Sequence, residues 1–273
     1  MNDIKSLQNV CLEILKEVDR VCKKHNILYW LDSGSMLGAV RHHGFIPWDD
    51  DLDIAMFRDD YNRFCEIAPQ ELKSGYFLQT RKTDPEYPLF FAKVRKDNTF
   101  IDEKNFRKLH INKGIFIDIF PVDKMPKKNS LIKRHRLYLW FLFRLYFQTG
   151  KNIVPVSSFL SKPILKFLLK FIKINKNKLY NYIDKVYTKY NTNKEYNYTA
   201  SWTMAQKFNW LYKKEWYESF IEVPFEDMTA KIPVGYDELL TNAYGDYMTP
   251  PPKEKQVPGH GLSFSTDVEG DSK

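Results

Sequence analysis

Residues 47–54 constrain the fold more than any other part of the sequence, because four aspartates fall within five positions between apolar flanks. The segment reads Pro47-Trp48-Asp49-Asp50-Asp51-Leu52-Asp53-Ile54. Alternate residues of a strand point to the same face, so Asp51 and Asp53 project together while Leu52 faces a core. Like charges at this spacing are unfavourable unless a cation neutralises them, and carboxylates are ligands that Mg²⁺ or Mn²⁺ prefers. The segment therefore predicts a strand that carries a metal site.

A third carboxylate stands in a second apolar segment. Asp118 is the one acidic residue of Gly114-Ile115-Phe116-Ile117-Asp118-Ile119-Phe120, and an isolated charge in a buried strand needs a partner. If the two strands are neighbours, the three carboxylates lie together and can hold two cations roughly 3.5 to 4 Å apart. Two cations at this distance stabilise both the attacking and the leaving oxygen of an in-line phosphoryl transfer. We therefore expect Asp51, Asp53 and Asp118 to be metal-binding and catalytic, with Mg²⁺ or Mn²⁺ as the cofactor.

The acidic cluster also has a plainer interpretation. Aspartates commonly gather in solvated turns and at helix N-termini, and Asp49 and Asp50 precede the expected strand, where either can be a turn residue. The apolar flanks and the second acid in an apolar strand favour the metal site. Asp50 is retained as a candidate for substrate binding.

A glycine-serine turn lies just upstream of the acidic segment. Ser33-Gly34-Ser35 ends a short apolar run and opens a helical pattern at 36–42. Such a turn presents backbone N–H groups and a hydroxyl to an anion, and the helix dipole strengthens the attraction. By itself it is more often a simple strand-to-helix turn, but the acidic strand about sixteen residues later favours phosphate binding. The expected phosphate-binding residues are Gly34, Ser35, Arg41 and His42.

The rest of the chain alternates helical and strand patterns without an internal repeat. Its 273 residues are 43% hydrophobic and 28% charged, which is a globular composition. An apolar stripe predicts a helix over 4–22, with Cys11 and Cys22 in the core. Further helices are expected near 61–68 and 236–244, and strands at 27–32, 51–56, 76–80, 90–94, 99–102 and 115–120. The pattern predicts an α+β fold, with a sheet core, flanking helices and a helical lobe.

Basic residues concentrate in the middle of the chain. Residues 127–190 contain fifteen Lys or Arg and one acid, Asp184, a net charge of +14, whereas the whole chain carries +8 and the remainder therefore −6. The stretches 137–143 and 164–173 mix apolar and basic residues at helical spacing, as helices that rest on anionic lipid do. An ordinary lobe with a solvated lysine-rich face is the plainer alternative. Nucleic acid is not expected as a partner, because no nucleic-acid motif accompanies the charge.

These changes in composition and charge along the sequence divide the chain into three expected parts. Residues 1–126 form a catalytic core, residues 127–215 a basic helical lobe, and residues 216–273 a C-terminal segment with a Pro-rich, extended stretch at 249–255. No signal peptide and no run of about 18 apolar residues is visible. The three cysteines, Cys11, Cys22 and Cys65, form no C-x-x-C pair. The sequence predicts a cytoplasmic protein.

The motifs taken together resemble the signature of the LicD family, the bacterial phosphocholine transferases, whose relatives include the fukutin group. The resemblance covers the chain from end to end except its basic middle. The residues that carry it are Gly34 to His42, Gly44 to Ile54, Ile117-Asp118-Ile119-Phe120-Pro121, Tyr236-Asp237-Glu238-Leu239-Leu240, Tyr244-Gly245-Asp246-Tyr247-Met248 and Pro251-Pro252-Lys253-Glu254-Lys255.

The resemblance implies a nucleotidyltransferase-like mixed β-sheet core to which residues 216–273 return at the active site. It also implies that divalent metal, in two sites, activates a CDP-linked donor, and that a glycan hydroxyl takes the phospho-alcohol while CMP leaves. In that scheme Asp118 is the hypothetical general base, and Arg41 and Lys255 offset negative charge on the leaving group. Members of the family often end this tail with two adjacent histidines, so only His260 of Gly259-His260-Gly261 matches.

The resemblance implies only the chemical class of the donor and of the acceptor. CDP-choline is the expected donor, and ethanolamine, ribitol and glycerol donors stay open. The implied acceptors are cell-surface glycans such as lipopolysaccharide or teichoic-acid precursors. These are often lipid-linked at the inner face of the membrane. The basic segment suits peripheral contact with that face. A choline headgroup requires an aromatic cage or a carboxylate. The aromatic candidates for such a cage are Tyr29, Trp30, Trp202, Trp210 and Trp216. For each of them, packing in the core is the better explanation.

Two other functions are compatible with parts of the pattern. A cytidylyltransferase would use the same metal site to attack CTP and make a CDP-alcohol, releasing pyrophosphate instead of CMP. A non-catalytic membrane-surface protein would need no divalent metal, because the aspartates would then be structural.

Overall fold

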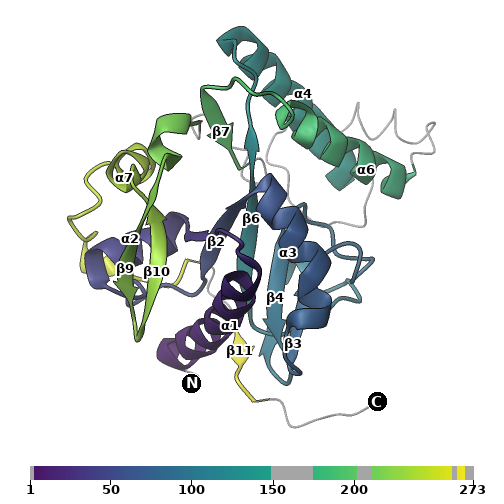
Figure 1. The fold of residues 1–273 in the computed structure, drawn as a ribbon. Helices are drawn as coiled ribbons and strands as arrows, with labels where there is room; N and C mark the ends of the chain where they lie inside the picture. Colours follow the sequence, from purple (N-terminus) through teal and green to yellow (C-terminus); the bar gives the residue numbers. More distant parts are fainter. Residues whose placement is uncertain (1–2, 149–174, 202–210, 260–262, 268–273) are drawn as a thin grey trace.

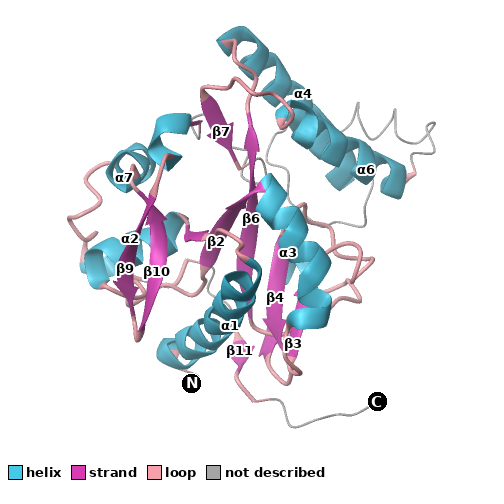
Figure 2. Cartoon of the chain, viewed as in Figure 1, coloured by secondary structure: helices cyan, strands magenta, loops and turns pink. Residues whose placement is uncertain are grey.

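A mixed sheet forms the centre of the computed structural model, which describes residues 3–148, 175–201, 211–259 and 263–267. Helices α1 (Ile4–His25) and α3 (Arg58–Glu71) lie across one face of this sheet (Figure 1). Helices and strands are interleaved along the chain (Figure 2). The predicted α+β class is confirmed.

Five strands form the main path of the sheet, in the order β1-β2-β6-β4-β3. Their bounds are Trp30–Leu31 for β1, Asp53–Phe57 for β2, Tyr76–Gln79 for β3, Ala92–Lys96 for β4 and Phe116–Lys124 for β6. β2 and β6 are parallel, and the other pairs are antiparallel. Each strand overlaps a range that the hydrophobic pattern predicted. The remaining predicted strand, β5 (Phe100–Ile101), pairs instead with β11 (Phe264–Ser265).

Helix α1 confirms the apolar stripe at the start of the chain. Asp3 caps its N-terminus by accepting a hydrogen bond from the N–H of Lys5, and the helix ends at Asn26, which has φ +51°. Cys11 and Cys22 are buried, as the stripe predicts, and both are free thiols.

Alternation along the strands decides which side chains meet α1 and α3. Leu52, Ile54, Ile117 and Ile119 are fully buried and belong to the same apolar cluster as the inner residues of the two helices. Since neighbouring residues of a strand face opposite sides, Asp53 and Asp118, which lie between these residues, point to the other face of the sheet.

A second apolar cluster organises a helical lobe. Helices α4 (Asn129–Gln148) and α6 (Lys176–Tyr187) pack on each other through residues such as Leu139 and Ile183. Arg58 Nε and Nη2 donate to the two carboxylate oxygens of Asp123 at 2.8 and 2.6 Å, which anchors the lobe side of β6 to α3. The predicted amphipathic stretch 164–173 lies outside the described residues. The division of the chain at 126 and 215 stays a prediction.

The C-terminal part adds elements that the sequence patterns did not predict. Strands β7 (Tyr198–Ala200) and β8 (Tyr212–Lys213) extend the sheet from β6, and β9 (Phe220–Phe225) and β10 (Met228–Pro233) form a hairpin. Helix α7 has its predicted bounds, Tyr236–Tyr244. Short 3-10 turns are η1 Lys104–Phe106, η2 Thr188–Tyr190, η4 Lys214–Tyr217 and η5 Lys253–Lys255. Within the described ranges, no helix combines the length and apolarity needed to cross a bilayer.

Candidate active site

A row of polar side chains crosses the sheet from strand to strand. Backbone pairing places Asp53 of β2 beside Asp118 of β6, and Asp118 beside Lys93 of β4. Gln79 of β3 extends the row beyond Lys93, and Asp32, which follows β1, extends it at the other end by donating its N–H to the carbonyl of Asp53 at 3.0 Å. Cross-strand neighbours share one face of a sheet, so these residues form one continuous polar row.

Three further aspartates precede β2 and lie near this row. Carboxylate oxygens of Asp49, Asp50 and Asp51 all lie within 4.8 Å of one another. Asp51 is close enough to Asp53 and Asp118 for its charge to raise the pKa of both. The structure thus places Asp51 near Asp53 and Asp118, whereas the described acidic group whose oxygens all lie within 4.8 Å of one another is Asp49, Asp50 and Asp51. The metal-binding and catalytic roles of Asp51, Asp53 and Asp118 stay predictions.

Burial and mutual repulsion disfavour the ionised forms of these carboxyl groups. Burial raises the pKa of Asp53 well above its usual range, and the charges on Asp51 and Asp118 raise it further. Burial likewise raises the pKa of Asp118 to about 6, although the neighbouring ammonium of Lys93 acts in the opposite direction. Such a cluster is costly as bare carboxylates and becomes favourable when cations neutralise it.

Lys93 is a site residue that sequence reasoning missed. It is 2% exposed, and its ammonium lies 2.9 Å from Asp118 Oδ1 and 3.1 Å from Glu103 Oε1. Glu103 in turn accepts a hydrogen bond at 2.6 Å from Arg95, which also donates to Gln79 at 2.6 Å. The side chain of Asp118 is therefore held by a buried network of charges on the same face of the sheet.

The predicted turn at 33–35 is the first turn of helix α2 (Ser33–His42), and it lies against the acidic segment. A methyl group added at Gly34 would lie 3.0 Å from Asp49 Oδ2, so glycine lets the side chain of Asp49 approach the helix. The Ser35 hydroxyl accepts the N–H of Asp53 at 2.8 Å, which fixes the start of β2. Asp32 precedes the helix as its N-cap residue, and burial raises its pKa to about 6. The phosphate-binding roles of Gly34 and Ser35 stay predictions.

Arg41 and His42 lie at the other end of α2. Arg41 Nε donates to His42 Nε2 at 2.9 Å, and Arg41 Nη1 donates to the carbonyl of Tyr247 at 2.7 Å. No carboxylate in the described part of the chain forms an ion pair with Arg41. Partial burial lowers the pKa of Arg41, as expected for a guanidinium that lacks a carboxylate partner. An anionic ligand would supply the missing charge.

The C-terminal tail returns to the acidic cluster. A methyl group on Gly259 would lie 3.8 Å from Asp50 Oδ1, and Asp50 itself is buried. Burial raises the pKa of Tyr244, and the charges on Asp32 and Asp53 raise it further. This residue of α7 therefore lies close to the polar row. Lys255 is exposed on η5, and His260 lies outside the described residues. The roles predicted for Asp50, Lys255 and His260 are therefore untested.

A cavity opens beside the carboxylates. It has a volume of about 330 Å³, and Asp51 and Asp118 form part of its wall. The other lining residues are Leu89, Phe91, Lys93, Glu103, Lys104, Asn105, Phe106 and Phe116. Of the aromatic candidates proposed from the sequence, the three that the structure describes do not line it. Tyr29 donates to Asp19 in the core, Trp30 is fully buried, Trp216 packs on the core, and Trp202 and Trp210 lie outside the described residues.

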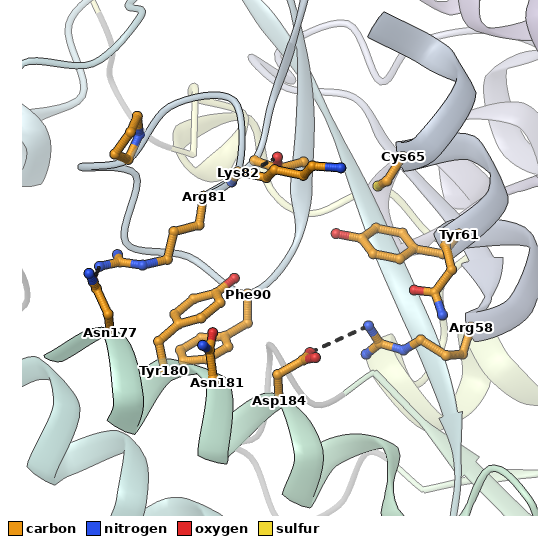
Figure 3. Close-up of a pocket in the computed structure, with 13 residues that line it drawn as sticks. Arg58, Tyr61, Cys65, Arg81, Lys82, Phe90, Asn177, Tyr180, Asn181 and Asp184 are labelled. Carbon is orange, nitrogen blue, oxygen red and sulfur yellow. Dashed lines mark hydrogen bonds and ion pairs between the residues drawn. The ribbon is translucent and has the colours of Figure 1, made fainter. Parts of the chain in front are cut away.

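A second cavity, of about 570 Å³, lies between α3 and α6 (Figure 3). Arg58 lies 3.8 Å from the carboxylate of Asp184 across it. Arg81 places its guanidinium 4.9 Å from the ring centre of Tyr180 and donates to Asn177 Oδ1 at 2.5 Å. These contacts join the core to the helical lobe.

The donor set suits a hard divalent cation. Asp51, Asp53 and Asp118 supply only carboxylate oxygens, the ligand type that Mg²⁺ and Mn²⁺ prefer over softer metals. Burial and the mutual repulsion of these carboxylates raise the pKa of Asp53 and Asp118, so a bound cation would favour their ionised forms. Residues and electrostatics are therefore compatible with the expected metal.

Comparison with known proteins extends these observations. The family model described as LicD/FKTN/FKRP, nucleotidyltransferase domain, matches residues 26–157, a range that includes the whole polar row. The lipopolysaccharide cholinephosphotransferase LicD of Haemophilus influenzae is 33% identical over 276 residues, which cover 94% of this chain and 96% of that protein.

Two further relatives match shorter regions. An uncharacterized protein of Rickettsia prowazekii is 45% identical over 126 residues, 46% of this chain and 43% of that protein. The human ribitol 5-phosphate transferase FKRP is 42% identical over 60 residues, 20% of this chain and 12% of that protein. The extent of the match to the Haemophilus protein shows that the chain belongs to the LicD family.

Proposed function

We propose that this transferase moves phosphocholine from CDP-choline to a hydroxyl group of a lipopolysaccharide glycan and releases CMP. The observation that carries the proposal is the juxtaposition of Asp53 and Asp118 in paired parallel strands with Asp51 close to both. The name of the Haemophilus relative, lipopolysaccharide cholinephosphotransferase, supports the choice of group and acceptor.

The proposed reaction is an in-line displacement at the phosphorus that carries choline. The acceptor oxygen forms a bond to this phosphorus, the bond to the bridging oxygen breaks, and CMP leaves with the electron pair. Asp118 takes the proton of the hydroxyl group as the general base. Asp51 and Asp53 would hold divalent cations, with Asp118 as a shared ligand. Bound cations would neutralise charge on the diphosphate.

Charge on the leaving group needs compensation as well. Arg41 is half-buried, lacks an ion-pair partner among the described residues and is held by the carbonyl of Tyr247. A guanidinium in that state suits a phosphate oxygen, because its fork can donate two hydrogen bonds at once. We propose Arg41, with Lys255 of the tail, as the group that stabilises departing CMP.

The proposal is tested by following the products of CDP-choline with Mg²⁺ or Mn²⁺ and lipopolysaccharide that lacks phosphocholine. We expect equimolar CMP and phosphocholine-modified lipopolysaccharide, and loss of both on chelation of the metal. A teichoic-acid precursor in place of lipopolysaccharide tests the other implied acceptor. Pyrophosphate release from CTP and phosphocholine, with no CMP from CDP-choline, would instead identify a cytidylyltransferase.

We also propose that the enzyme works at the cytoplasmic face of a membrane, through peripheral contact of α4 with anionic lipid. Leu131, Leu137 and Phe141 are 38%, 57% and 48% exposed on this helix. They line one surface depression together with Arg134 and Lys189. Exposed apolar side chains flanked by cations are typical of helices that lie in a lipid interface.

Replacement of both Leu137 and Phe141 by Ser is expected to weaken binding to anionic vesicles severalfold, because it removes buried apolar contact with lipid. Co-sedimentation with phosphatidylglycerol vesicles at low salt measures the effect, and phosphatidylcholine vesicles provide the neutral comparison. Replacement of Ile221 and Val234, exposed apolar residues away from α4, by Ser is the matched control. Equal recovery of the wild-type protein with both kinds of vesicle would rule out electrostatic docking.

A further inference from the structure

The second cavity, between α3 and α6, is lined mainly by polar side chains (Figure 3). Its volume of about 570 Å³ lies within the range of roughly 300 to 1,000 Å³ that small-molecule sites occupy. Asn62 from α3 and Asn177 and Asn181 from α6 line it, and their amide groups supply both hydrogen-bond donors and acceptors. The contacts that join the core to the helical lobe use only part of this wall.

Three polar side chains of the wall are available to a ligand. Asn62, Lys82 and Asn181 are exposed, and their side chains form no hydrogen bond or ion pair within the part of the chain that the structure describes. Lys82 lies on the loop after β3 and faces the cavity from the side opposite to Asn181 (Figure 3). A ligand between these two residues would meet a cation on one side and an amide on the other.

Arg81 is a fixed cation at one end of the second cavity. Its guanidinium donates to the carbonyl of Tyr87 at 3.2 Å, to the hydroxyl of Tyr146 at 3.1 Å and to Asn177 Oδ1 at 2.5 Å. All three acceptors are neutral, and no carboxylate among the described residues forms an ion pair with Arg81. The hydrogen bonds therefore hold the guanidinium in place without neutralising its charge, and Lys82 adds a second cation to this end of the wall.

The charge of the wall favours an anionic guest. Arg58, the third cation of the wall, already pairs with Asp123 and lies 3.8 Å from the carboxylate of Asp184, so its end of the cavity is neutralised. Among the lining residues, the excess positive charge therefore lies at Arg81 and Lys82. A phosphate or carboxylate group bound there would supply the missing negative charge through charge-assisted hydrogen bonds.

The aromatic rings of the wall offer no free face for a nucleobase. Tyr180 is stacked on Phe90, with ring centres 4.2 Å apart and an angle of 10° between the planes, and the guanidinium of Arg81 lies 4.9 Å from the ring centre of Tyr180. The guanidinium of Arg58 lies 5.3 Å from the ring centre of Tyr61. Because a base is usually held by stacking on an aromatic ring, this wall suits hydroxyl groups and an anion better than it suits the nucleoside of the donor.

A segment of three residues, 89–91, separates the second cavity from the cavity beside the carboxylates. Leu89 and Phe91 line the cavity that contains Asp118, whereas Phe90, between them, lines the second cavity. The hydroxyl of Tyr180 donates to the carbonyl of Leu89 at 3.2 Å, which joins the two walls. Because only this segment separates the two cavities, a glycan of several sugars is long enough to reach both.

We propose that the second cavity binds an anionic sugar of the acceptor glycan, one that carries a phosphate or carboxylate group, while another sugar of the same glycan presents its hydroxyl group beside Asp118. The inference rests on the proposed function and adds the chemical class of sugar that the enzyme requires in its acceptor. In this arrangement Arg81 and Lys82 bind the anion, and Asn62 and Asn181 bind hydroxyl groups.

Binding of a lipid-free acceptor tests this assignment without turnover. The probe is the oligosaccharide of lipopolysaccharide that lacks phosphocholine, titrated calorimetrically into the full-length protein at low salt with a chelator present. We expect Lys82→Met to weaken binding about 5- to 10-fold, because a charge-assisted hydrogen bond is lost. Oligosaccharide stripped of its phosphate and carboxylate groups should bind the wild type and Lys82→Met equally weakly. Asn181→Ala should weaken binding of both forms about 3-fold.

Lys178→Met is the control, because Lys178 is an exposed lysine of α6 that does not line the cavity. This variant should bind the oligosaccharide as the wild type does. During turnover, Lys82→Met and Asn181→Ala should raise KM for the oligosaccharide by the factors seen in binding and leave kcat and KM for CDP-choline unchanged.

The possible results separate this inference from the proposed function. If Lys82→Met and Asn181→Ala bind the intact oligosaccharide as tightly as the wild type, or raise KM for CDP-choline instead, the inference is wrong. Weaker binding of Lys82→Met to phosphatidylglycerol vesicles, with unchanged binding to the oligosaccharide, would identify a lipid phosphate as the ligand and also overturn it. A wild-type protein that shows the expected binding but releases no CMP from CDP-choline would contradict the proposed function alone.

Discussion

Asp53→Asn is expected to reduce turnover by at least about 10³-fold while stabilising the metal-free protein. The amide keeps the volume of the side chain but is a poor ligand for a hard cation, and the lost stabilisation of the transition state amounts to several kcal/mol. In the absence of metal, the buried carboxylate of Asp53 lies among like charges, which raise its pKa. Removing that charge relieves the repulsion.

The effect on stability has a definite dependence on pH. Because the pKa of Asp53 is higher in the folded than in the unfolded chain, the folded state holds this proton more tightly, and the contribution of Asp53 to the stability of the metal-free protein falls as pH rises above about 4. The Asn variant should lose less stability over the same range. Thermal unfolding with a chelator present, at several pH values, measures the difference. Glu66→Gln, an exposed carboxylate of α3, is the control, and equal pH slopes in wild type and D53N would contradict the proposed electrostatics.

Lys93→Met is expected to lower the free energy of unfolding by about 3 to 5 kcal/mol, because it leaves the buried Asp118 without its cation and Glu103 with Arg95 alone. Methionine has nearly the same length as the lysine stem, so the loss reflects charge and not packing. Unfolding in guanidinium chloride measures the change.

Lys96→Met provides the matched control on the same strand. Lys96 pairs with Glu13, which is 57% exposed, so the ion pair lies in solvent and its loss should cost less than about 1 kcal/mol. If the Lys93 variant has the same free energy of unfolding as the wild type, the buried network contributes nothing to stability. Lys93 would then not hold Asp118 in place.

The sequence alone predicts the acidic half of the site. Asp51 and Asp53 stand two residues apart in a segment predicted as a strand, and Asp118 is a lone acid in a second apolar segment. In the structure β2 begins at Asp53, so Asp51 lies in the loop just before the strand. Alternation fixes their faces, and the cost of a buried unpaired charge favours their meeting. The structure confirms the neighbourhood through the pairing of Asp53 with Asp118.

The basic half of the site depends on strand register, which the sequence does not specify. Lys93 lies in a segment predicted as a strand, but its partners come from β6 and from the loop that contains Glu103. One signal was available, because a lysine and an arginine alternate in the apolar run Phe-Phe-Ala-Lys-Val-Arg, at 90–95, and buried cations require carboxylates. Which carboxylates meet them is decided only by the fold.

The β9–β10 hairpin shows a different limit. Pro224 lies within β9, and proline in a run of strand-forming residues argues against a strand. The structure accommodates it in a two-stranded ribbon, where proline is tolerated on an edge. The turn residue Glu226 adopts φ +54° without being glycine or asparagine, so the usual turn signal is absent.

The most direct test of the central claim, that Asp51, Asp53 and Asp118 bind divalent cations together, is thermal unfolding in a titration of Mn²⁺. For the wild-type protein we expect saturating Mn²⁺ to raise the unfolding midpoint by about 5 to 10 °C, as ligand at roughly a hundredfold excess over its Kd would. Asp51→Asn, Asp53→Asn and Asp118→Asn should each lose most of that rise, whereas Glu66→Gln should keep it. A wild-type protein that Mn²⁺ does not stabilise, or three variants that it stabilises as much as the wild type, would contradict the metal site.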